Sequence, residues 1–302
     1  MRFPNASIDL GTNSARLLIG IIDSRKSIRP LVLKRTITRL GGGFSRERGL
    51  SQEARARSVT VLREFAADIE RWRAAKVRAV ATSAVRDAAN GHDFIAEVWR
   101  ESGLRLEIID GREEGLLTLS GIFSGIRSDG DSFVFDIGGG STEYTLARDG
   151  VPLFTKSLPL GVVRLMEGKN SVEAMDDKVC RELEELRHDM ASAGFVGFSS
   201  DTRLIGTAGT PTTLAGINLK LDNYDSRSVN GYCLSRATIR NIFANILSMT
   251  TEQRLTVPGI ERGREDLIVE GTLITIRTME IFGFRDLIVS EGGLLEGLLL
   301  NI

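Results

Sequence analysis

The chain has 302 residues, 42% of them hydrophobic, which is enough for one to three globular domains with sizeable cores. Lysine plus arginine number 39 and aspartate plus glutamate 40, a balance that argues against a nonspecific nucleic-acid binder. The first residues show no signal-peptide pattern and no apolar run reaches the ~18 residues of a membrane span, so we expect a cytoplasmic protein. Cys180 and Cys233 match no metal-binding spacing and are expected to be reduced.

The first third of the chain alternates predicted strands and helices, the pattern of a mixed sheet flanked by helices. Alternating apolar residues predict strands, and apolar residues at three- and four-residue spacing predict helices, one of them with Ser51 near its N-terminus. The expected order is strands at 7–9, 15–22 and 31–40, a helix at 50–75, a strand at 77–82, a helix at 92–102, a strand at 104–108 and a helix at 113–125.

The remainder of the chain begins again with three expected strands, so the order of elements recurs. No low-complexity linker separates the two parts. The expected order is strands at 133–136, 142–147 and 151–158, a helix at 171–193, a strand at 203–207, helices at 210–220, 235–248 and 263–282, a strand at 287–290 and a helix at 294–300.

A short signature occurs twice along the chain. Residues 9–14 read Asp-Leu-Gly-Thr-Asn-Ser and residues 136–141 read Asp-Ile-Gly-Gly-Gly-Ser, so both fit the pattern D-x-G-x-x-S. Each copy lies between two apolar runs, as expected for a tight turn between strands. Such a turn presents backbone N–H groups that hold a phosphate, and the aspartate before it can bind a divalent cation. Two copies predict two similar domains facing each other, with a phosphorylated substrate between them.

A third glycine-containing turn, Gly-Thr-Ala-Gly-Thr-Pro at residues 206–211, joins an expected strand to an expected helix. The N-terminus of a helix attracts anions because its first N–H groups have no partner within the helix. The turn is therefore expected to line the same phosphate site. Taken alone, it also fits a glycine turn kept for close packing.

These motifs resemble those of the exopolyphosphatase and guanosine pentaphosphate phosphatase family, in the superfamily of actin, sugar kinases and Hsp70. Further matching stretches follow in the family's order: ATSAVRDAAN at 81–90, GREEG at 111–115, Thr142-Glu143 after the second signature, and SEGGL at 290–294. The resemblance implies an α/β fold of two ribonuclease H-like domains facing across a cleft. We expect these domains at residues 1–122 and 123–302, with the helix in 292–302 packing back on the first. The chain is similar to the short, two-domain members.

The resemblance also implies roles for individual residues. Glu114 matches the general base that activates the attacking water, and Arg86 matches the arginine that grips the terminal phosphate. From the residues alone, Glu113 and Glu114 also fit solvated carboxylates at a helix start, and Arg86 also fits a surface partner of Asp87. The expected metal, Mg²⁺ with Mn²⁺ as the alternative, is assigned to Asp9, Asp136 and Glu143. Phosphate is assigned to Thr12, Asn13, Ser14, Ser83, Arg86, Gly138, Gly139, Gly140, Ser141, Thr142, Gly206, Thr207 and Gly209.

The two signatures differ in one respect that bears on the chemistry. Glu143 lies seven residues after Asp136, whereas Arg16 holds the corresponding place after Asp9. We therefore expect phosphate to be gripped from both sides and water to be activated from the side of Glu114. A basic path for a polyanion is a further hypothesis for the arginines at 16, 35, 39, 46, 48, 164, 262 and 264.

The expected reaction is hydrolysis of the terminal phosphoanhydride of inorganic polyphosphate, with release of orthophosphate. Three alternatives stay open: a guanosine pentaphosphate 5′-phosphohydrolase, a phosphotransferase of the sugar-kinase type, and a non-catalytic sensor of polyphosphate or guanosine tetraphosphate. The ATSAVRD stretch and Glu114 argue against the kinase, and the retained carboxylates argue against the sensor. The expected partner is the substrate, with a homodimer compatible with the family, and neither nucleic acid nor a membrane.

Overall fold

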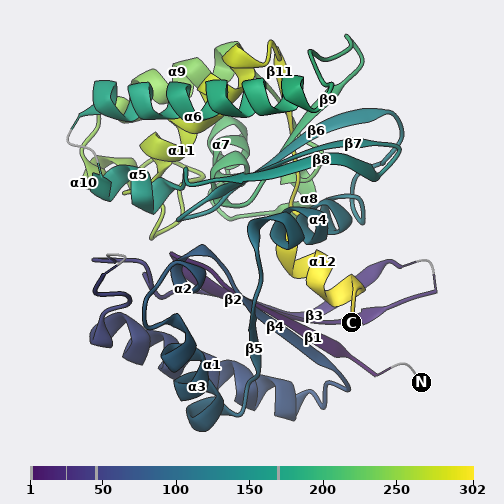
Figure 1. The fold of residues 1–302 in the computed structure, drawn as a ribbon, viewed down its shortest axis with the longest axis vertical. Helices are drawn as coiled ribbons and strands as arrows, with labels where there is room; N and C mark the ends of the chain where they lie inside the picture. The colour runs from purple at the N-terminus through teal and green to yellow at the C-terminus, as the bar shows by residue number, and fades with distance from the viewer. Residues whose placement is uncertain (1–2, 25, 45–46, 169–170) are drawn as a thin grey trace. The chain divides into compact units, whose positions relative to one another are not determined.

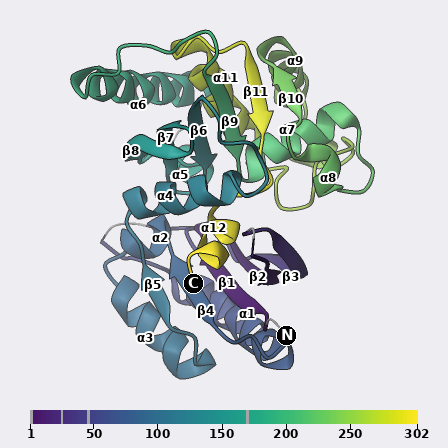
Figure 2. The ribbon, with the colours of Figure 1, turned by 90° about the vertical axis from the view of Figure 1, so that its right-hand side faces the viewer.

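The computed structural model describes residues 3–24, 26–44, 47–168 and 171–302 (Figures 1 and 2). Contacts divide the chain into two compact units: unit 1 comprises Met1–Ser124 and Gly292–Ile302, and unit 2 comprises Gly125–Glu291. The chain therefore leaves unit 1, forms unit 2 and returns to unit 1. The sequence prediction places the boundary between residues 122 and 123. The cleft between two domains stays a prediction.

In the described part of unit 1, five strands form one sheet in the order β3-β2-β1-β4-β5. β1, β2 and β3 are antiparallel neighbours, whereas β4 and β5 add in parallel. The strands are β1 (Asn5–Leu10), β2 (Ser14–Ile22), β3 (Ile28–Ile37), β4 (Val77–Ala81) and β5 (Leu106–Ile108). The helices are α1 (Gln52–Arg71), α2 (Ser83–Arg86), α3 (Gly91–Ser102), α4 (Gly111–Ile122) and α12 (Leu294–Leu300).

Helices cover both faces of the unit 1 sheet, because its side chains alternate between the two faces. Ala6, Ile8 and Leu10 of β1 are buried in a core shared with α1 and α3. On the opposite face, Val80 of β4 packs against Leu294 of α12 and residues of α4. Figure 1 shows α1 and α3 on one side of this sheet and α4 with α12 on the other. The sheet thus has a separate core on each face, and the apolar residues of β1 belong to the one shared with α1 and α3.

Unit 2 repeats this arrangement within its described residues. The order of its sheet is β10-β11-β9-β6-β7-β8, so β8-β7-β6-β9-β11 matches β3-β2-β1-β4-β5 in both order and strand direction. β10 is an added antiparallel edge strand. The strands are β6 (Asp131–Ile137), β7 (Thr142–Arg148), β8 (Val151–Leu158), β9 (Arg203–Thr207), β10 (Cys233–Ser235) and β11 (Asp286–Val289). The predicted α/β fold of two ribonuclease H-like domains is confirmed.

The helices of unit 2 pack on its sheet and on one another. They are α5 (Val162–Gly168), α6 (Val172–Ser192), α7 (Gly209–Leu219), α8 (Ser226–Val229), α9 (Arg236–Leu247), α10 (Thr251–Arg254) and α11 (Ile268–Ile281). Phe133, Phe135 and Tyr144 stack on the face of the sheet that α6 and α11 cover. Burial raises the pKa of Tyr144, whose hydroxyl hydrogen-bonds the Thr278 hydroxyl at 2.7 Å. Aromatic packing therefore forms much of this core.

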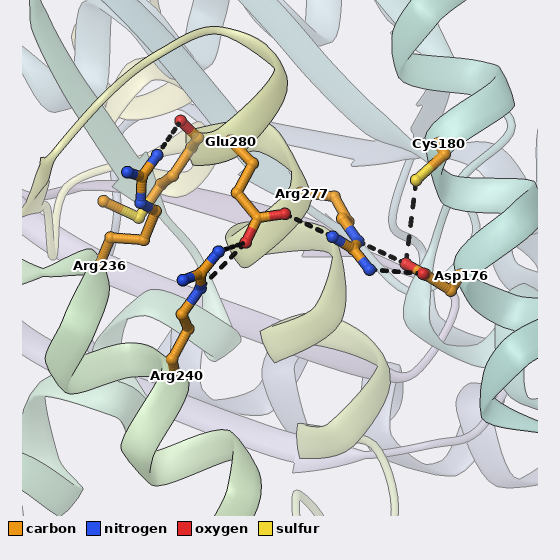
Figure 3. Close-up of polar contacts among 7 residues, drawn as sticks. Asp176, Cys180, Arg236, Arg240, Arg277 and Glu280 are labelled. Atoms are coloured by element: carbon orange, nitrogen blue, oxygen red, sulfur yellow. Dashed lines mark hydrogen bonds and ion pairs between the residues drawn. The ribbon is translucent and has the colours of Figure 1, made fainter.

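An ion-pair network joins three helices of unit 2 (Figure 3). Arg277 of α11 pairs with Asp176 of α6 and with Glu280 one turn further along α11, and Glu280 also pairs with Arg240 of α9. Although burial opposes it, the two arginines lower the pKa of Glu280. The Asp176 carboxylate does most to raise the pKa of Arg277. This network fixes the three helices in register around charges that are only partly exposed to water.

The predicted state of the cysteines is confirmed, because Cys180 and Cys233 are both free thiols. Figure 3 shows Cys180 beside Asp176, and burial raises the pKa of this thiol. No helix in the described ranges combines the length and the apolar character needed to cross a lipid bilayer.

Candidate functional site

The two signature turns have the same backbone geometry. The Gly11 N–H donates to the Ser14 carbonyl at 2.9 Å, and the Gly138 N–H donates to the Ser141 carbonyl at the same distance. Each turn encloses two residues, Thr12 and Asn13 in the first and Gly139 and Gly140 in the second. Among the described residues, no hydrogen-bond acceptor is found for their N–H groups. Each turn therefore presents adjacent N–H donors to an anion.

The first turn is held from outside by its own carbonyl groups. The Asn13 carbonyl accepts the N–H groups of Thr38 and Arg39, and the Thr12 carbonyl accepts the Gly41 N–H at 2.8 Å. A Cβ at Gly41 would lie 2.3 Å from Thr12 Cγ2, so only glycine allows this approach. The glycine-rich stretch after β3 thus packs against the carbonyl groups of the turn and does not engage the N–H groups of the turn.

The second turn is held by the start of α5, a helix that the sequence prediction missed. The first N–H groups of α5 belong to Val162 and Val163 and donate to the Gly138 and Gly139 carbonyls at 3.1 and 2.9 Å. The Thr142 hydroxyl donates to the Leu160 carbonyl, and Thr142 is fully buried. The Thr142 side chain therefore supports the turn, and the phosphate contact predicted for its backbone N–H stays a prediction.

Cross-strand pairing places a different partner beside each signature aspartate. Asp9 of β1 lies opposite Arg16 of β2, and Asp136 of β6 lies opposite Glu143 of β7. Arg16 donates through Nε and Nη2 to Asp9 Oδ2 at 3.0 and 2.9 Å. The carboxylate of unit 1 is thus neutralised by a guanidinium, whereas the carboxylate of unit 2 stands beside a second carboxylate.

The carboxylate pair of unit 2 has the donor set of a magnesium site. Asp136 and Glu143 are both buried, and Ser157 on the next strand donates to Glu143 Oε1 at 2.6 Å. Thr207 of β9 pairs with Asp136 on the other side, so these side chains share one face of the sheet. Mg²⁺ in proteins is commonly held by one or two carboxylates together with substrate phosphates and water. The described residues contain no group of three or more acidic, histidine or cysteine ligands, so the metal site stays a prediction.

Unit 1 brings Glu114 and Arg86 together. Glu114 lies in the first turn of α4, where its charge is favoured by the helix dipole, and is only 7% exposed. Arg86 Nη1 donates to Glu114 Oε2 at 3.2 Å and to the Ile109 carbonyl at 2.9 Å, whereas Asp87 lies 3.9 Å away. Glu113 points elsewhere and pairs with Arg78 at 2.7 Å. The buried member of the glutamate pair is therefore the one beside the arginine.

A hydroxyl pair lies at the start of α2, the helix that carries Arg86. The hydroxyls of Thr12 and Ser83 are 2.9 Å apart, and the Thr82 N–H donates to the Leu10 carbonyl at 3.2 Å. The end of β4 is thus tied to the first signature turn. One connected part of unit 1 consequently holds three residues predicted to bind phosphate, Thr12, Ser83 and Arg86, together with the predicted base Glu114.

The third turn follows β9 and begins α7. A Cβ at Gly206 would lie 2.7 Å from the Phe135 ring, so this glycine serves close packing. Gly209 lies under the Arg264 guanidinium, whose Nη1 would be 1.6 Å from a Cβ there. The Thr207 hydroxyl donates to the Ser290 carbonyl at 3.1 Å. Gly206, Thr207 and Gly209 are the three residues of this turn that were predicted to bind phosphate. Gly209 is the one that lies beside a cationic side chain.

Comparison with known proteins identifies the family. The model of the Ppx/GppA phosphatase family matches residues 19–302. The chain belongs to this family. Its fold and sequence are similar to those of the PPX-GPPA enzyme of Aquifex aeolicus, with 31% identity, full coverage of both chains and a TM-score of 0.82. The resemblance seen in the sequence is thereby confirmed, and the chain is a hydrolase.

Two curated relatives of this Ppx/GppA phosphatase differ in length. Exopolyphosphatase 2 of Mycobacterium tuberculosis is 31% identical, and the alignment covers 98% of both chains. The bifunctional 3-dehydroquinate synthase/phosphatase of Fusobacterium nucleatum is also 31% identical over 99% of this chain. The chain spans only 46% of that longer protein.

The arginines predicted to form a basic path remain a prediction. Arg16 and Arg264 each lie beside a candidate phosphate turn, at Asp9 and Gly209 respectively. Arg46 lies outside the described residues. Sequence reasoning missed Ser157 as a partner of Glu143, because the register of β7 and β8 shifts between Leu146 and Ala147 and regular pairing from the turn would place Lys156 there instead.

The Ppx/GppA phosphatase also buries a carboxyl group in α11 that sequence reasoning did not single out. Glu270 is 6% exposed, and its Oε2 has no hydrogen-bond partner among the described residues. Burial raises its pKa from 4.5 to about 6, aided by Asp266 and opposed by Arg254. The adjacent Gly271 contacts Thr210 closely, since a Cβ there would lie 1.9 Å from the Thr210 hydroxyl oxygen. Glu270 therefore lies where α11 crosses the start of α7.

We expect Glu270→Gln to stabilise the protein at pH 8 but not at pH 4. Between pH 4.5 and about 6, Glu270 keeps its proton in the native state and loses it in the unfolded chain, so the free energy of unfolding falls as the pH rises. A pKa shift of this size corresponds to about 2 kcal/mol in the free energy of unfolding, or about 4–8 °C in Tm. Thermal unfolding at both pH values measures the effect, with Glu173→Gln on the exposed start of α6 as control. Equal Tm gains at both pH values would contradict the assignment.

Proposed function

We propose that the chain hydrolyses the terminal phosphoanhydride of inorganic polyphosphate and releases orthophosphate. The observation that carries the proposal is the buried Glu114 carboxylate, held 3.2 Å from the Arg86 guanidinium at the start of α4. A carboxylate in this setting suits a general base, and an arginine beside it suits a phosphate. A relative of nearly the same length is named exopolyphosphatase 2, which favours polyphosphate as the substrate.

In this proposal, each residue of unit 1 has a distinct task. Glu114 accepts the proton of the attacking water, and Arg86 neutralises charge on the transferred phosphoryl group. Arg86 Nη2 makes no hydrogen bond within the described chain, so it supplies further donors for phosphate oxygens. The N–H groups of the signature turns bind phosphate oxygens without carrying charge themselves. A phosphate leaving group needs no strong general acid.

The carboxylates of unit 2 supply the metal site of the proposal. Asp136 and Glu143 would hold Mg²⁺, with the Ser157 hydroxyl orienting Glu143. When bound, the ion would neutralise negative charge on the phosphates. Asp9 stays a predicted ligand, although Arg16 already engages its Oδ2.

The test is phosphate release from three substrates: long-chain polyphosphate, guanosine pentaphosphate and ATP. We expect release from polyphosphate, with loss of release when EDTA removes the divalent metal and recovery when Mg²⁺ is restored. Faster release from guanosine pentaphosphate would transfer the proposal to that substrate. Formation of ADP and a sugar phosphate from ATP and an added sugar, without release of orthophosphate, would indicate a kinase. Neither that transfer nor release from any of the three substrates would indicate a sensor.

A further inference from the structure

Unit 1 contains a cavity at the end of its sheet that lies away from the first signature turn. The cavity has a volume of about 640 Å³ and lies where β4 begins, at Val77, between the last turns of α1 and α3. Figure 1 shows α1 and α3 next to each other on one side of this sheet. β4 runs parallel to β1, so its other end, at Ala81, is the one that lies near the signature turn and leads to Arg86. The cavity is therefore separate from the candidate phosphate site of this unit.

The inside of the cavity is mostly apolar. Ile69 of α1, Val77 and Leu104 contribute aliphatic side chains, and Trp99 of α3 contributes its indole ring. Ile69 and Leu104 are buried, whereas Val77 is 42% exposed and Trp99 is 47% exposed. Large apolar side chains that stay exposed around a hollow often mark a binding site. The volume and the lining are typical of a site for a small organic molecule.

Three charged side chains from the described residues line the same cavity. The Arg105 guanidinium lies over the Trp99 ring, 4.8 Å from the ring centre, in a cation–π contact. Arg73 and Glu70 are the other two. Among the described residues, no ion pair is found for any of these three side chains. The cavity therefore offers guanidinium donors to an anion and a carboxylate acceptor to N–H groups of a ligand.

Arg73 stands at a position where glycine is the usual residue. Its φ is +50°, in the left-handed region, and its N–H donates to the Glu70 carbonyl at 2.9 Å as α1 ends. The neighbouring helix α3 ends at Gly103 with a φ of +70°, so there the expected glycine is present. The backbone at residue 73 thus favours glycine, and the end of the helix does not itself require the arginine side chain.

We propose that this cavity binds a nucleoside monophosphate with an amino-bearing purine base, such as AMP or GMP. The base packs on the apolar lining and the Trp99 ring, the guanidinium groups of Arg73 and Arg105 bind the phosphate, and the Glu70 carboxylate accepts the amino group of the base. A purely apolar ligand would leave all three charges without a partner, and an aromatic acid has no amino group for Glu70. The inference goes beyond the proposed hydrolysis, because the cavity shares no residue with that site.

The test is calorimetric titration of the full chain with AMP and with GMP. We expect saturable binding at millimolar concentrations or below, and a Kd raised about tenfold in Trp99→Ala, because a base stacked on an aromatic ring contributes about this factor. Arg73→Gly should raise Kd by a similar factor while Tm stays unchanged or rises, because glycine suits the left-handed backbone. Arg71→Gln and Trp72→Ala are the matched controls, since both residues are exposed nearby but do not line the cavity.

The chain contains two tryptophans, so Trp72→Phe leaves Trp99 as the single indole fluorophore. Bound nucleotide should quench the emission of this variant, and unchanged emission at saturation would contradict contact with Trp99. The inference would also be overturned by no saturable binding of either nucleotide, by equal losses in the control variants, or by binding of indole-3-acetate alone, which would indicate a site for aromatic acids. Displacement of the nucleotide by inorganic phosphate, with Trp99→Ala unaffected, would place binding at the candidate phosphate site instead. All of these readouts measure binding, so a failure of the proposed hydrolysis leaves them unchanged.

Discussion

Replacement of Glu114 by glutamine is expected to lower kcat by about 10²–10⁴-fold, the usual contribution of a general base. Glutamine has nearly the same shape and keeps an oxygen for Arg86 Nη1, which the carboxylate engages at 3.2 Å. It cannot take the proton of the attacking water. Substrate binding should therefore persist while turnover falls. Single-turnover phosphate release, together with a binding measurement on polyphosphate, separates the two effects.

The matched control for this variant is Glu113→Gln. Glu113 is the preceding residue of the same helix, but its side chain is 45% exposed and pairs with Arg78. A surface pair of this kind contributes little to stability, so the control should keep wild-type turnover. Near-normal kcat in Glu114→Gln, or an equal loss in both variants, would remove Glu114 from the role of base.

Replacement of Arg86 by alanine is expected to lower kcat/KM by about 10- to 100-fold, the size associated with hydrogen bonds to a charged group. From the sequence, the phosphate-gripping role of Arg86 predicts mainly a loss of substrate capture, visible as a rise in KM. The structure adds a second effect, because Arg86 also contacts the Glu114 carboxylate and the Ile109 carbonyl. We therefore expect kcat to fall together with the rise in KM. Steady-state kinetics over a range of polyphosphate concentrations measures both constants.

Two further variants show which property of Arg86 matters. Arg86→Lys keeps the charge but loses the planar fork, so it should recover only part of the activity. Arg78→Ala removes an arginine whose partners are the exposed carboxylates of Glu107 and Glu113, and should leave the kinetics unchanged. Unchanged KM and kcat in Arg86→Ala would indicate that Arg86 only forms a surface ion pair with Asp87, the alternative that the sequence also fits.

The sequence predicted the long elements well because their periodicity extends over many residues. Ser51 caps α1 as expected, with its hydroxyl oxygen accepting the Ala54 N–H. The repeated signature predicted two matching turns, and their equal hydrogen bonds agree with the repeat. Arg16 and Glu143 were expected at corresponding positions, and strand register places both opposite an aspartate. These features are local, or follow from the alternation of a hairpin.

Short elements and long-range contacts were missed for physical reasons. The helices α2, α5, α8 and α10 and strand β10 have only three to seven residues, too few for a period to appear. The helix expected from Gly263 begins only at Ile268, because the Glu265 carboxylate accepts the N–H groups of Gly263 and Arg264 and closes a turn there. The strand expected to reach Leu40 ends at Ile37, because the next N–H groups turn to the Asn13 carbonyl. No local pattern indicates that the Ser7 hydroxyl donates to the Leu295 carbonyl.

The return of residues 292–302 to unit 1 has a consequence for biosynthesis. Residues 1–124 leave the ribosome first, yet the face of their sheet that carries Leu18 and Val80 is covered by leucines of α12. Until those leucines emerge, this apolar face lacks its native cover and is exposed to chaperones or to aggregation. Unit 2, which is continuous in sequence, has all of its residues available earlier. We therefore expect unit 2 to complete folding before unit 1 during translation, although unit 1 is the first to be synthesised.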